Sequence, residues 1–190
     1  MLNRRVLKTL ALLAGASIYS AVAWAAGAEV SGYGGGSWSN GGDLTTISGL
    51  KGGSSGAFGG AAGVKLGAAH VLAEFGYATV ASGSNSGIGV TQRTVDFGAA
   101  FDYGFGSSEK VTPYVAADLG IAHGSATFSA AGASANTGDG NQLYAGVGGG
   151  LRFFVGHSWG LKPEVMFRRY RSDGINTITY GLGVFYDFGK

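Results

Sequence analysis

The sequence contains no cysteine, only two prolines, and few charged residues, which make up 13% of its 190 positions. Without cysteine the chain forms no disulfide, has no catalytic thiolate and binds no zinc through sulfur. Soluble domains carry roughly 25% charged residues, about twice this share. Long hydrophobic runs are also missing beyond the N-terminal segment, where no stretch approaches the ~18 apolar residues of a transmembrane helix. These absences argue against both an ordinary soluble domain and a helical membrane protein.

Glycine is abundant instead, with 38 residues. It follows no G-X-Y period and proline is scarce, which excludes collagen. Each glycine disfavours a helix by about 1 kcal/mol, and glycines occur in every segment. Apolar residues alternate with small or polar ones, which is the two-residue period of β-strands. The sequence therefore predicts an all-β fold, and its length suits one domain.

The first residues have the three parts of a secretory signal peptide. Arg4, Arg5 and Lys8 form a basic start, and an apolar stretch follows over residues 9–22. Small-residue triplets suited to cleavage come next, at Ala23-Trp24-Ala25 and Ala26-Gly27-Ala28. A short membrane helix is the alternative, but the apolar stretch is shorter than the ~20 residues that span a bilayer.

Removal of this segment changes the charge of the protein. The full chain has 13 basic and 11 acidic residues, and the signal holds three of the basic ones and none of the acids. The remainder is nearly neutral, so charge gives no support for binding nucleic acid. We expect a signal peptide over residues 1–25, cleaved between about residues 25 and 28, and one β-barrel domain over residues 26–190.

Alternation predicts eight strands, most of them longer than the mean of ~5–6 residues in soluble proteins and close to the ~9–11 residues of a tilted strand that crosses a bilayer. They are Glu29–Ser39, Gly56–Leu66, Val71–Val80, Gln92–Tyr103, Val111–His123, Asn141–Val155, Trp159–Arg171 and Asn176–Phe188.

The connections alternate in length. Three are long and rich in glycine, serine and asparagine: Asn40–Ser55, Ala81–Thr91 and Gly124–Gly140. Three are short: Gly67–His70, Gly104–Lys110 and Gly156–Ser158. Up-and-down outer-membrane barrels have an even number of strands, short periplasmic turns and longer outer loops. The pattern predicts an eight-stranded antiparallel up-and-down transmembrane β-barrel, with both termini on the periplasmic side.

The two faces of each predicted strand differ in a way that indicates which face meets lipid. From Thr94 to Tyr103, one face carries valine, phenylalanine, alanine and tyrosine, whereas the other carries threonine, aspartate, glycine and alanine. The interior of an eight-stranded barrel is just wide enough to be filled by side chains, so glycine and alanine are needed there beside each large residue. We expect the apolar faces to meet lipid and the glycine-rich faces to line the lumen.

Isolated charges interrupt the inward faces. They are Lys65, Arg152 and Arg168 against Glu74, Asp96, Asp118 and Glu164. Because an unpaired buried charge is costly, we expect a paired network that fills the lumen, and we favour this structural role over a proton path or a gate.

Aromatic residues cluster toward the strand ends, as in the two aromatic girdles of membrane barrels. The predicted girdles consist of Tyr103, Phe105, Tyr114, Phe153, Trp159, Tyr186 and Phe188 near the short turns, and of Trp38, Tyr77, Tyr170 and Tyr180 near the long loops. Arg169 and Arg171 lie at the long-loop end and either reach toward lipid phosphates or are ordinary rim charges.

Three stretches carry a family resemblance that extends over the whole mature chain. They are Val111-Thr112-Pro113-Tyr114-Val115, the run YAGVGGG at residues 144–150, and the C-terminal strand. Together they resemble the small outer-membrane β-barrel domains grouped with OmpA, OmpX and the opacity proteins. The resemblance implies the outer membrane of a Gram-negative-type bacterium, with lipid and lipopolysaccharide as surroundings.

The C-terminal strand also resembles the signal that the barrel-assembly machinery reads, a glycine followed by alternating aromatics, here Gly183, Tyr186 and Phe188. Two features depart from the pattern: Gly181 stands where a polar residue is usual, and residues 189–190 extend past the terminal aromatic.

Catalytic and binding alternatives rest on short motifs. His123-Gly124-Ser125 is similar to the His-x-Ser pair of lipid A deacylases, but it lies mid-chain, and the next acid is Asp139. His70 and His157 are expected to be solvated turn residues. Gly36-Ser37-Trp38 matches the Gly-x-Trp of lipocalins, which would require an apolar lumen. We expect no catalytic residues, no metal and no cofactor.

The function expected is therefore structural or interactive: a membrane anchor whose extracellular loops bind a ligand at the surface. The alternatives are a small channel, a lipocalin-like periplasmic binder and a lipid A-modifying enzyme. The partners expected are outer-membrane lipid and lipopolysaccharide, the assembly machinery and an extracellular ligand, but not nucleic acid.

Overall fold

The structure of the protein is a computed structural model that describes residues 27–40, 54–85, 88–106, 110–130, 133–171 and 174–188. The predicted signal peptide lies outside these residues. The described residues form eight strands: β1 (Ala28–Ser39), β2 (Ser54–Leu66), β3 (Ala69–Asn85), β4 (Ile88–Gly104), β5 (Val111–Ala130), β6 (Ala133–Phe154), β7 (Trp159–Tyr170) and β8 (Asn176–Phe188).

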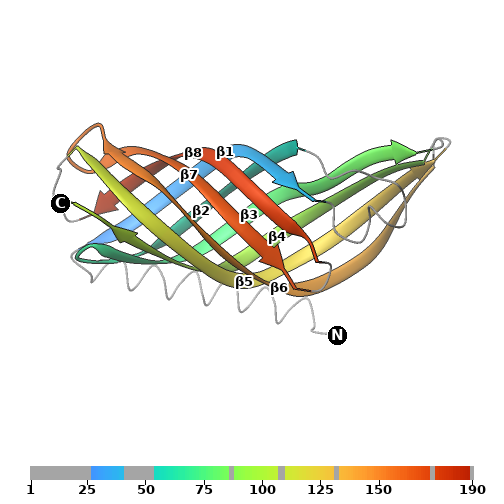
Figure 1. The fold of residues 1–190 in the computed structure, drawn as a ribbon, viewed down its shortest axis with the longest axis horizontal. Helices are drawn as coiled ribbons and strands as arrows, with labels where there is room; N and C mark the ends of the chain where they lie inside the picture. The colour runs from blue at the N-terminus through green and yellow to red at the C-terminus, as the bar shows by residue number, and fades with distance from the viewer. Residues whose placement is uncertain are drawn as a thin grey trace.

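Each strand pairs with the next one in an antiparallel arrangement, and β1 also pairs with β8, which closes the sheet into a barrel (Figure 1). The closing register runs from Ala28 opposite Phe188 to Ser39 opposite Thr177. Closure satisfies the backbone hydrogen bonds of strands that would otherwise be exposed edges. The predicted eight-stranded up-and-down barrel is confirmed.

One end of the barrel carries short turns and both ends of the described chain. The β2–β3 turn places Leu66 opposite Ala69, and Gly67 has a φ of 67°. This left-handed conformation favours glycine because a Cβ would be strained there. At the β6–β7 turn, the backbone N–H of Val155 donates to the carbonyl of Trp159 over 3.1 Å. Tight turns at this end agree with the short connections predicted from the sequence.

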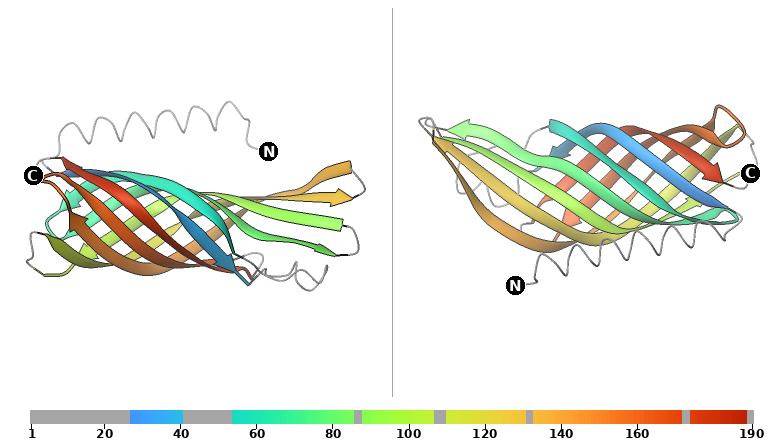
Figure 2. Two further views of the ribbon diagram at one scale, coloured as in Figure 1. Left: turned by 90° about the horizontal axis from the view of Figure 1, so that it is seen from above. Right: turned by 180° about the vertical axis from the view of Figure 1, so that it is seen from behind.

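The opposite end differs from the prediction. The expected long loops Ala81–Thr91 and Gly124–Gly140 are largely strand, because β3 continues to Asn85, β4 starts at Ile88, β5 continues to Ala130 and β6 starts at Ala133. These four strands therefore project beyond the others (Figures 1 and 2). The prediction failed because it relied on the alternation of apolar and polar residues. The projecting strands enclose no lumen, so they need no alternating apolar face. Most of the third expected loop, Asn40–Ser55, lies outside the described residues.

The projecting part is a four-stranded sheet. Its strands stay paired to their tips, with Asn85 opposite Ile88, Ile88 opposite Ala130, and Ala130 opposite Ala133. The outer neighbours stop earlier: β2 pairs with β3 only as far as Ala78, and β7 pairs with β6 only as far as Tyr144. Among the described residues, the extension therefore has two unpaired edges, on β3 and on β6.

Side chains alternate between the inside and the outside of the barrel. Along β5, Tyr114, Ala116 and Asp118 are buried, whereas the alternate residues Val115, Ala117 and Leu119 are exposed. Large apolar side chains dominate the outer face, where Leu119 is 67% exposed and Phe97 is 58% exposed. The apolar surface thus faces outward and the polar side chains face inward, which is the arrangement predicted from the two strand faces.

Glycine makes this interior possible at the point where β4, β5 and β6 meet. Gly98 lies opposite Gly120, and Gly120 lies opposite Tyr144. A Cβ added at Gly120 would lie 2.7 Å from the Tyr144 hydroxyl, which is closer than side chains tolerate. The absence of a side chain at this position leaves room for the tyrosine ring inside the barrel.

Candidate functional site

The lumen near the short turns holds an ion-pair cluster centred on Arg152, which is 3% exposed. Its Nη1 donates to Oε2 of Glu29, and its Nη2 donates to Oδ2 of Asp102 over 2.8 Å. Nζ of Lys162 donates to the same Asp102 oxygen over 2.9 Å. These contacts join β1, β4, β6 and β7 across the lumen, so one guanidinium links strands that are far apart in the sequence.

Aromatic rings complete this turn-end cluster. The Tyr114 hydroxyl donates to Oε2 of Glu164 over 2.5 Å, and Lys162 lies 4.9 Å from the centre of the Tyr114 ring. The Arg152 guanidinium lies 5.2 Å from the same ring and 5.7 Å from that of Phe185. Cation–π contacts of this kind stabilise a desolvated cation, so the rings help to hold the two cations inside the barrel.

His70 belongs to the same cluster. Its Nδ1 lies 2.7 Å from Oε2 of Glu29, and its ring nitrogens lie 3.0 and 3.1 Å from Nη1 of Arg152. The side chain is buried, so the expectation of a solvated turn residue was wrong. The β2–β3 turn is so short that His70 already belongs to β3, where it pairs with Asp102 of β4 and points into the lumen.

Glu29, His70 and Asp187 also offer ligand atoms that all lie within 4.8 Å of one another. This geometry could hold a metal ion, which sequence spacing did not suggest because the three residues come from β1, β3 and β8. Arg152 contacts Glu29, and Nζ of Lys65 lies 2.9 Å from Oδ2 of Asp187. A metal would compete with both cations, so we assign the three residues to the ion-pair network.

A second cluster occupies the lumen toward the extension and is centred on Arg168. Its Nε donates to Oδ2 of Asp118 over 2.6 Å, and its Nη2 lies 3.1 Å from both carboxylate oxygens of Glu74. Its Nη1 lies 3.6 Å from Oδ2 of Asp96. Three carboxylates on β3, β4 and β5 therefore surround one guanidinium on β7.

Two tyrosines add hydrogen bonds to this second cluster. The Tyr144 hydroxyl donates to Oε1 of Glu74 over 2.7 Å, and the Tyr170 hydroxyl donates to Oδ2 of Asp96 over 3.0 Å. Both rings are almost fully buried. The expected placement of Tyr114 and Tyr170 in the aromatic girdles was therefore wrong, because each shares the face of its inward-pointing neighbours rather than the apolar face.

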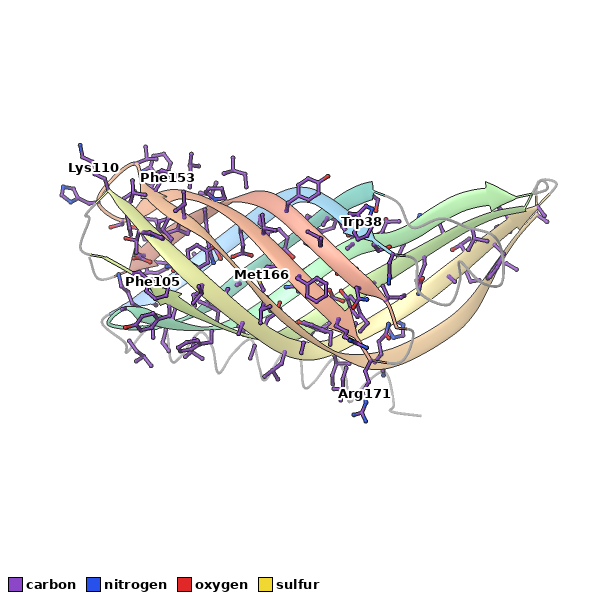
Figure 3. The ribbon with its side chains drawn as sticks, in the orientation of Figure 1. Trp38, Phe105, Lys110, Phe153, Met166 and Arg171 are labelled. Atoms are coloured by element: carbon purple, nitrogen blue, oxygen red, sulfur yellow. The ribbon has the colours of Figure 1, made fainter. Side chains whose placement is uncertain are left out.

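Little space remains between the two clusters. The cavity that separates them has a volume of about 40 Å³ and is lined by Glu74 and Asp102, one from each cluster, together with Met166. Met166 is buried midway along the barrel (Figure 3). A single water needs roughly 10–15 Å³, so this cavity has room for isolated waters and not for a continuous column.

The seven charged residues predicted for the lumen all belong to this network. Arg168 meets Glu74, Asp96 and Asp118 in one cluster, while Arg152, Lys65 and Glu164 belong to the other. Five further ion-pair residues of the network were not predicted: Glu29, His70, Asp102, Lys162 and Asp187. All five share the inward face of their strands, so strict alternation could have found them.

The outer wall is apolar over the length of the closed barrel. Exposed aromatic side chains lie near the short turns, among them Trp159 at the β6–β7 turn. Phe105 lies at the same end, and Trp38 lies toward the other end (Figure 3). Within the described residues, no helix is both long enough and apolar enough to cross a membrane.

Solved structures with the same arrangement are found among bacterial outer-membrane proteins. Neisserial surface protein A is similar with a TM-score of 0.65 at 15% identity, over 85% of this chain and 97% of that one. Ail, the attachment invasion locus protein of Yersinia pestis, gives 0.57 at 19% identity, over 85% and 98%. The N-terminal barrel domain of Pseudomonas aeruginosa OprF gives 0.53 at 18% identity, over 86% and 98%.

The chain has the fold of the small outer-membrane β-barrels. No protein-family model matches the sequence, and no curated protein matches it. At these low identities the likeness concerns the fold, and the roles of the neighbours do not transfer with it.

The three residues of the predicted assembly signal lie on the C-terminal strand β8. Tyr186 and Phe188 are exposed on the outer face, with ring centroids 4.8 Å apart. Gly183 points inward, where a Cβ would lie 3.2 Å from the carbonyl of Gly32. The two aromatics are therefore accessible from the side of the barrel.

The two short motifs take positions on this barrel that differ from those of the families they resemble. His123 is exposed on the outer face, and its Nδ1 lies 2.9 Å from Oδ1 of Asn141; no hydrogen bond joins it to Ser125 among the described residues. Trp38 is exposed on the outer face, whereas a lipocalin-like binder would need an apolar lumen. The ion clusters fill that space here.

Proposed function

We propose that the mature protein is an integral protein of a bacterial outer membrane, in which the closed barrel is a non-catalytic anchor for the extension of β3–β6 at the cell surface. One observation carries this proposal: an apolar outer wall surrounds a charged interior. Burying that wall in lipid is favourable at about 25 cal/mol per Å² of apolar area, whereas exposing it to water is not. The low share of charged residues supports the same environment.

The orientation follows from the asymmetry of the two ends. Outer-membrane barrels have short turns on the periplasmic side and longer segments outside. The turns around Gly67 and residues 155–158 therefore belong to the periplasm, and the extension belongs to the cell exterior. An exported chain with a signal peptide at residues 1–25 would reach this location.

The extension is the element best suited to contact a partner. Its two edges, Ala81–Asn85 on β3 and residues 133–140 on β6, carry backbone groups that no described strand pairs. An extended peptide can add to such an edge as a further strand. Ail, a protein of this fold, has been solved in complex with a heparin analogue, which is a precedent for ligand binding by such a barrel.

Surface labelling tests the proposal, because the chain has no cysteine of its own. Ser129 in the extension and His157 in the β6–β7 turn are both exposed. We expect a membrane-impermeant maleimide to label Ser129→Cys on intact cells, and to label His157→Cys only after the outer membrane is permeabilised.

The reverse labelling pattern would contradict the orientation. Recovery of both variants in the soluble periplasmic fraction, with no difference in gel mobility between boiled and unboiled samples, would contradict the membrane anchor itself. A soluble ligand-binding barrel would then replace it.

A further inference from the structure

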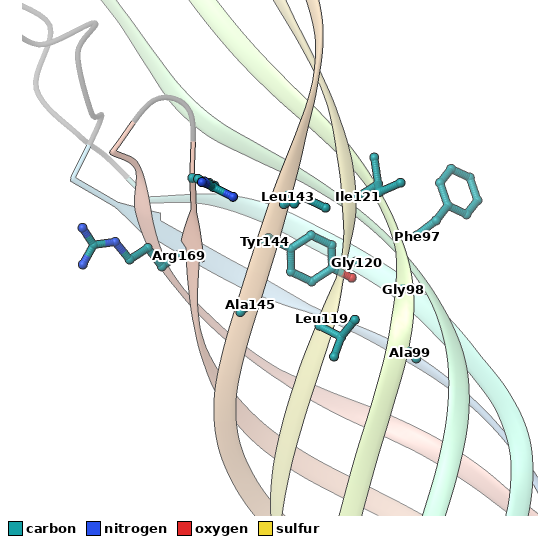
Figure 4. Close-up of a pocket in the computed structure, with 11 residues that line it drawn as sticks. Phe97, Gly98, Ala99, Leu119, Gly120, Ile121, Leu143, Tyr144, Ala145 and Arg169 are labelled. Carbon is teal, nitrogen blue, oxygen red and sulfur yellow. The ribbon is translucent and has the colours of Figure 1, made fainter. Parts of the chain in front are cut away.

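The outer wall has an apolar groove over β4, β5 and β6, next to the end of β7 (Figure 4). Two rows of outward side chains form it. In the first row, Ala99, Leu119, Ala145 and Arg169 lie opposite one another across four adjacent strands. The small side chains of Ala99 and Ala145 flank Leu119, so this row is hollowed on both sides of the leucine.

The second row lies one step nearer the extension. Phe97 lies opposite Ile121, and Ile121 lies opposite Leu143. The backbone N–H of Arg171 donates to the carbonyl of Leu143 over 2.9 Å, which fixes this arginine at the end of the row. The groove therefore has apolar walls and two arginines at one side, and its shape and chemistry suit an acyl chain with an anionic head.

Two exposed arginines mark one side of the groove. Arg169 and Arg171 are both exposed, and neither forms an ion pair with a described residue. Their neighbours toward the turn end are apolar, beginning with Phe167 on β7. A charged side chain at the edge of the hydrocarbon is unfavourable unless it reaches an anion or water. Guanidinium groups bind phosphate through paired hydrogen bonds.

Polar side chains continue the groove toward the extension. His123 and Asn141 face outward one step beyond Ile121 and Leu143, and they contact each other over 2.9 Å. At this height, beyond the apolar rows, their polar atoms are available to the hydroxyl groups of a sugar. This placement accounts for the exposed histidine of the His123-Gly124-Ser125 motif, which the proposed function does not use.

We propose that this groove binds one phosphorylated saccharolipid of the outer leaflet, of the lipid A type. An acyl chain lies along Leu119 and Ala145, and a phosphate lies on Arg169 and Arg171. The inference depends on the proposed outer-membrane location, in which this end of the barrel reaches the outer leaflet. A second copy of the chain fits the groove less well, because a symmetric contact centred on the groove would place the arginines of one copy against the apolar Phe97 and Ala99 of the other.

The test measures binding of a fluorescent bis-phosphorylated lipid A to the protein in phospholipid nanodiscs. We expect the double variant Arg169→Ala/Arg171→Ala to weaken binding at least about tenfold, since each phosphate contact is a charge-assisted hydrogen bond. The matched control is Arg93→Ala, which removes an exposed arginine of β4 outside the groove. We expect it to change binding less than about twofold.

A second pair of variants tests the apolar part. Ala145→Trp fills the groove, whereas Val115→Trp places the same bulk on the exposed face of β5 outside it. We expect only Ala145→Trp to weaken binding. Each variant is first checked for a shift in gel mobility between boiled and unboiled samples, so that loss of folding is recognised.

Equal binding of phosphorylated and dephosphorylated lipid A would overturn the proposal, and so would unchanged binding by the arginine double variant. Full competition by soluble tripolyphosphate would also overturn it, because it would indicate a phosphate site that does not bind a lipid chain. Each of these results is compatible with labelling of Ser129→Cys at the cell surface. Failure of the lipid-binding inference can therefore be distinguished from failure of the proposed anchor role.

Discussion

At the scale of single residues, the interior of this barrel depends on two arginines whose partners come from different strands. Arg168 is 6% exposed and contacts carboxylates of β3, β4 and β5, while Arg152 contacts those of β1 and β4. Removing one member of a buried ion pair leaves the other charge buried without a partner. The resulting loss of stability is larger than the stability that the intact pair contributes.

We therefore expect Arg168→Met to lower the free energy of unfolding by about 3–5 kcal/mol, because Glu74, Asp96 and Asp118 lose their shared cation. Urea unfolding in lipid vesicles, followed by gel mobility, measures this change. Arg93→Met is the control, since Arg93 is exposed and its loss should cost less than about 0.5 kcal/mol. Equal urea midpoints for the two variants would contradict a stabilising role for the network.

The residues of this network were only partly predictable from the sequence. Charges well inside alternating strands, such as Asp96 and Asp118, could be assigned to the lumen by alternation alone. His70 was assigned to a turn because its strand begins only one residue earlier. Tyr114 and Tyr170 were assigned to the girdles because they lie close to strand ends. Each is an even number of residues away from an inward-pointing charge, Asp118 or Arg168, and alternation therefore places it inside.

At the scale of the elements, the strands divide into two groups. β1, β2, β7 and β8 have 12 or 13 residues, whereas β3–β6 have 17 to 22. The shorter strands only close the barrel, and the additional residues of the longer ones form the extension. The strands β3–β6 therefore contribute to two structures: half of the wall of the closed barrel and the open sheet of the extension.

This division predicts that the extension can be removed without loss of the barrel. In the truncated protein, residues 81–90 and residues 125–139 are each replaced by an Asn-Gly turn. This change leaves every lumen contact of Arg152 and Arg168 in place. We expect the gel-mobility shift to persist and the urea midpoint to change little.

Binding by the extension is tested with the same truncated protein. A phage-displayed library of random peptides is panned on the full barrel in nanodiscs, and the selected peptides are then tested on the truncated form. We expect the selected peptides to lose binding to the truncated form, since the edges of β3 and β6 that no described strand pairs are gone. Retained binding would assign the interaction to the barrel wall or its rim, against the proposed role of the extension.

The strand ends could not be predicted because two different forces determine them. Within the barrel, alternation indicates which side chains lie on the apolar outer face and which line the lumen. In the extension neither face of the sheet lines a lumen, and the strands are held by backbone pairing between neighbours. Segments such as Gly124–Gly140, rich in glycine, serine and asparagine, therefore resemble loops in sequence while they pair as strands.

At the scale of the whole molecule, the two ion clusters block the lumen in series. A cavity of about 40 Å³ lies between them, and an eight-stranded barrel is just wide enough for its side chains. We expect the reconstituted protein to give no steady conductance in planar bilayers.

A variant gives this expectation a positive control. Replacing Arg152 and Lys162 with alanine removes the two large cations of the turn-end cluster. The additional substitution Arg168→Ala removes the central cation of the second cluster. If the unsubstituted protein conducts as steadily as this triple variant in its folded form, the lumen is a channel and the clusters do not close it.

The sequence by itself determined that the strands alternate, that their number is eight and that the apolar faces point outward, because each follows from local periodicity and from the room that a narrow barrel leaves. Only the tertiary structure decided which charges meet. Glu29 and Arg152 are brought together by closure of the barrel, and Ala145 and Arg169 form one wall of the groove because of the register of β6 and β7. Register and closure depend on pairing over the whole sheet, and no single strand carries that information.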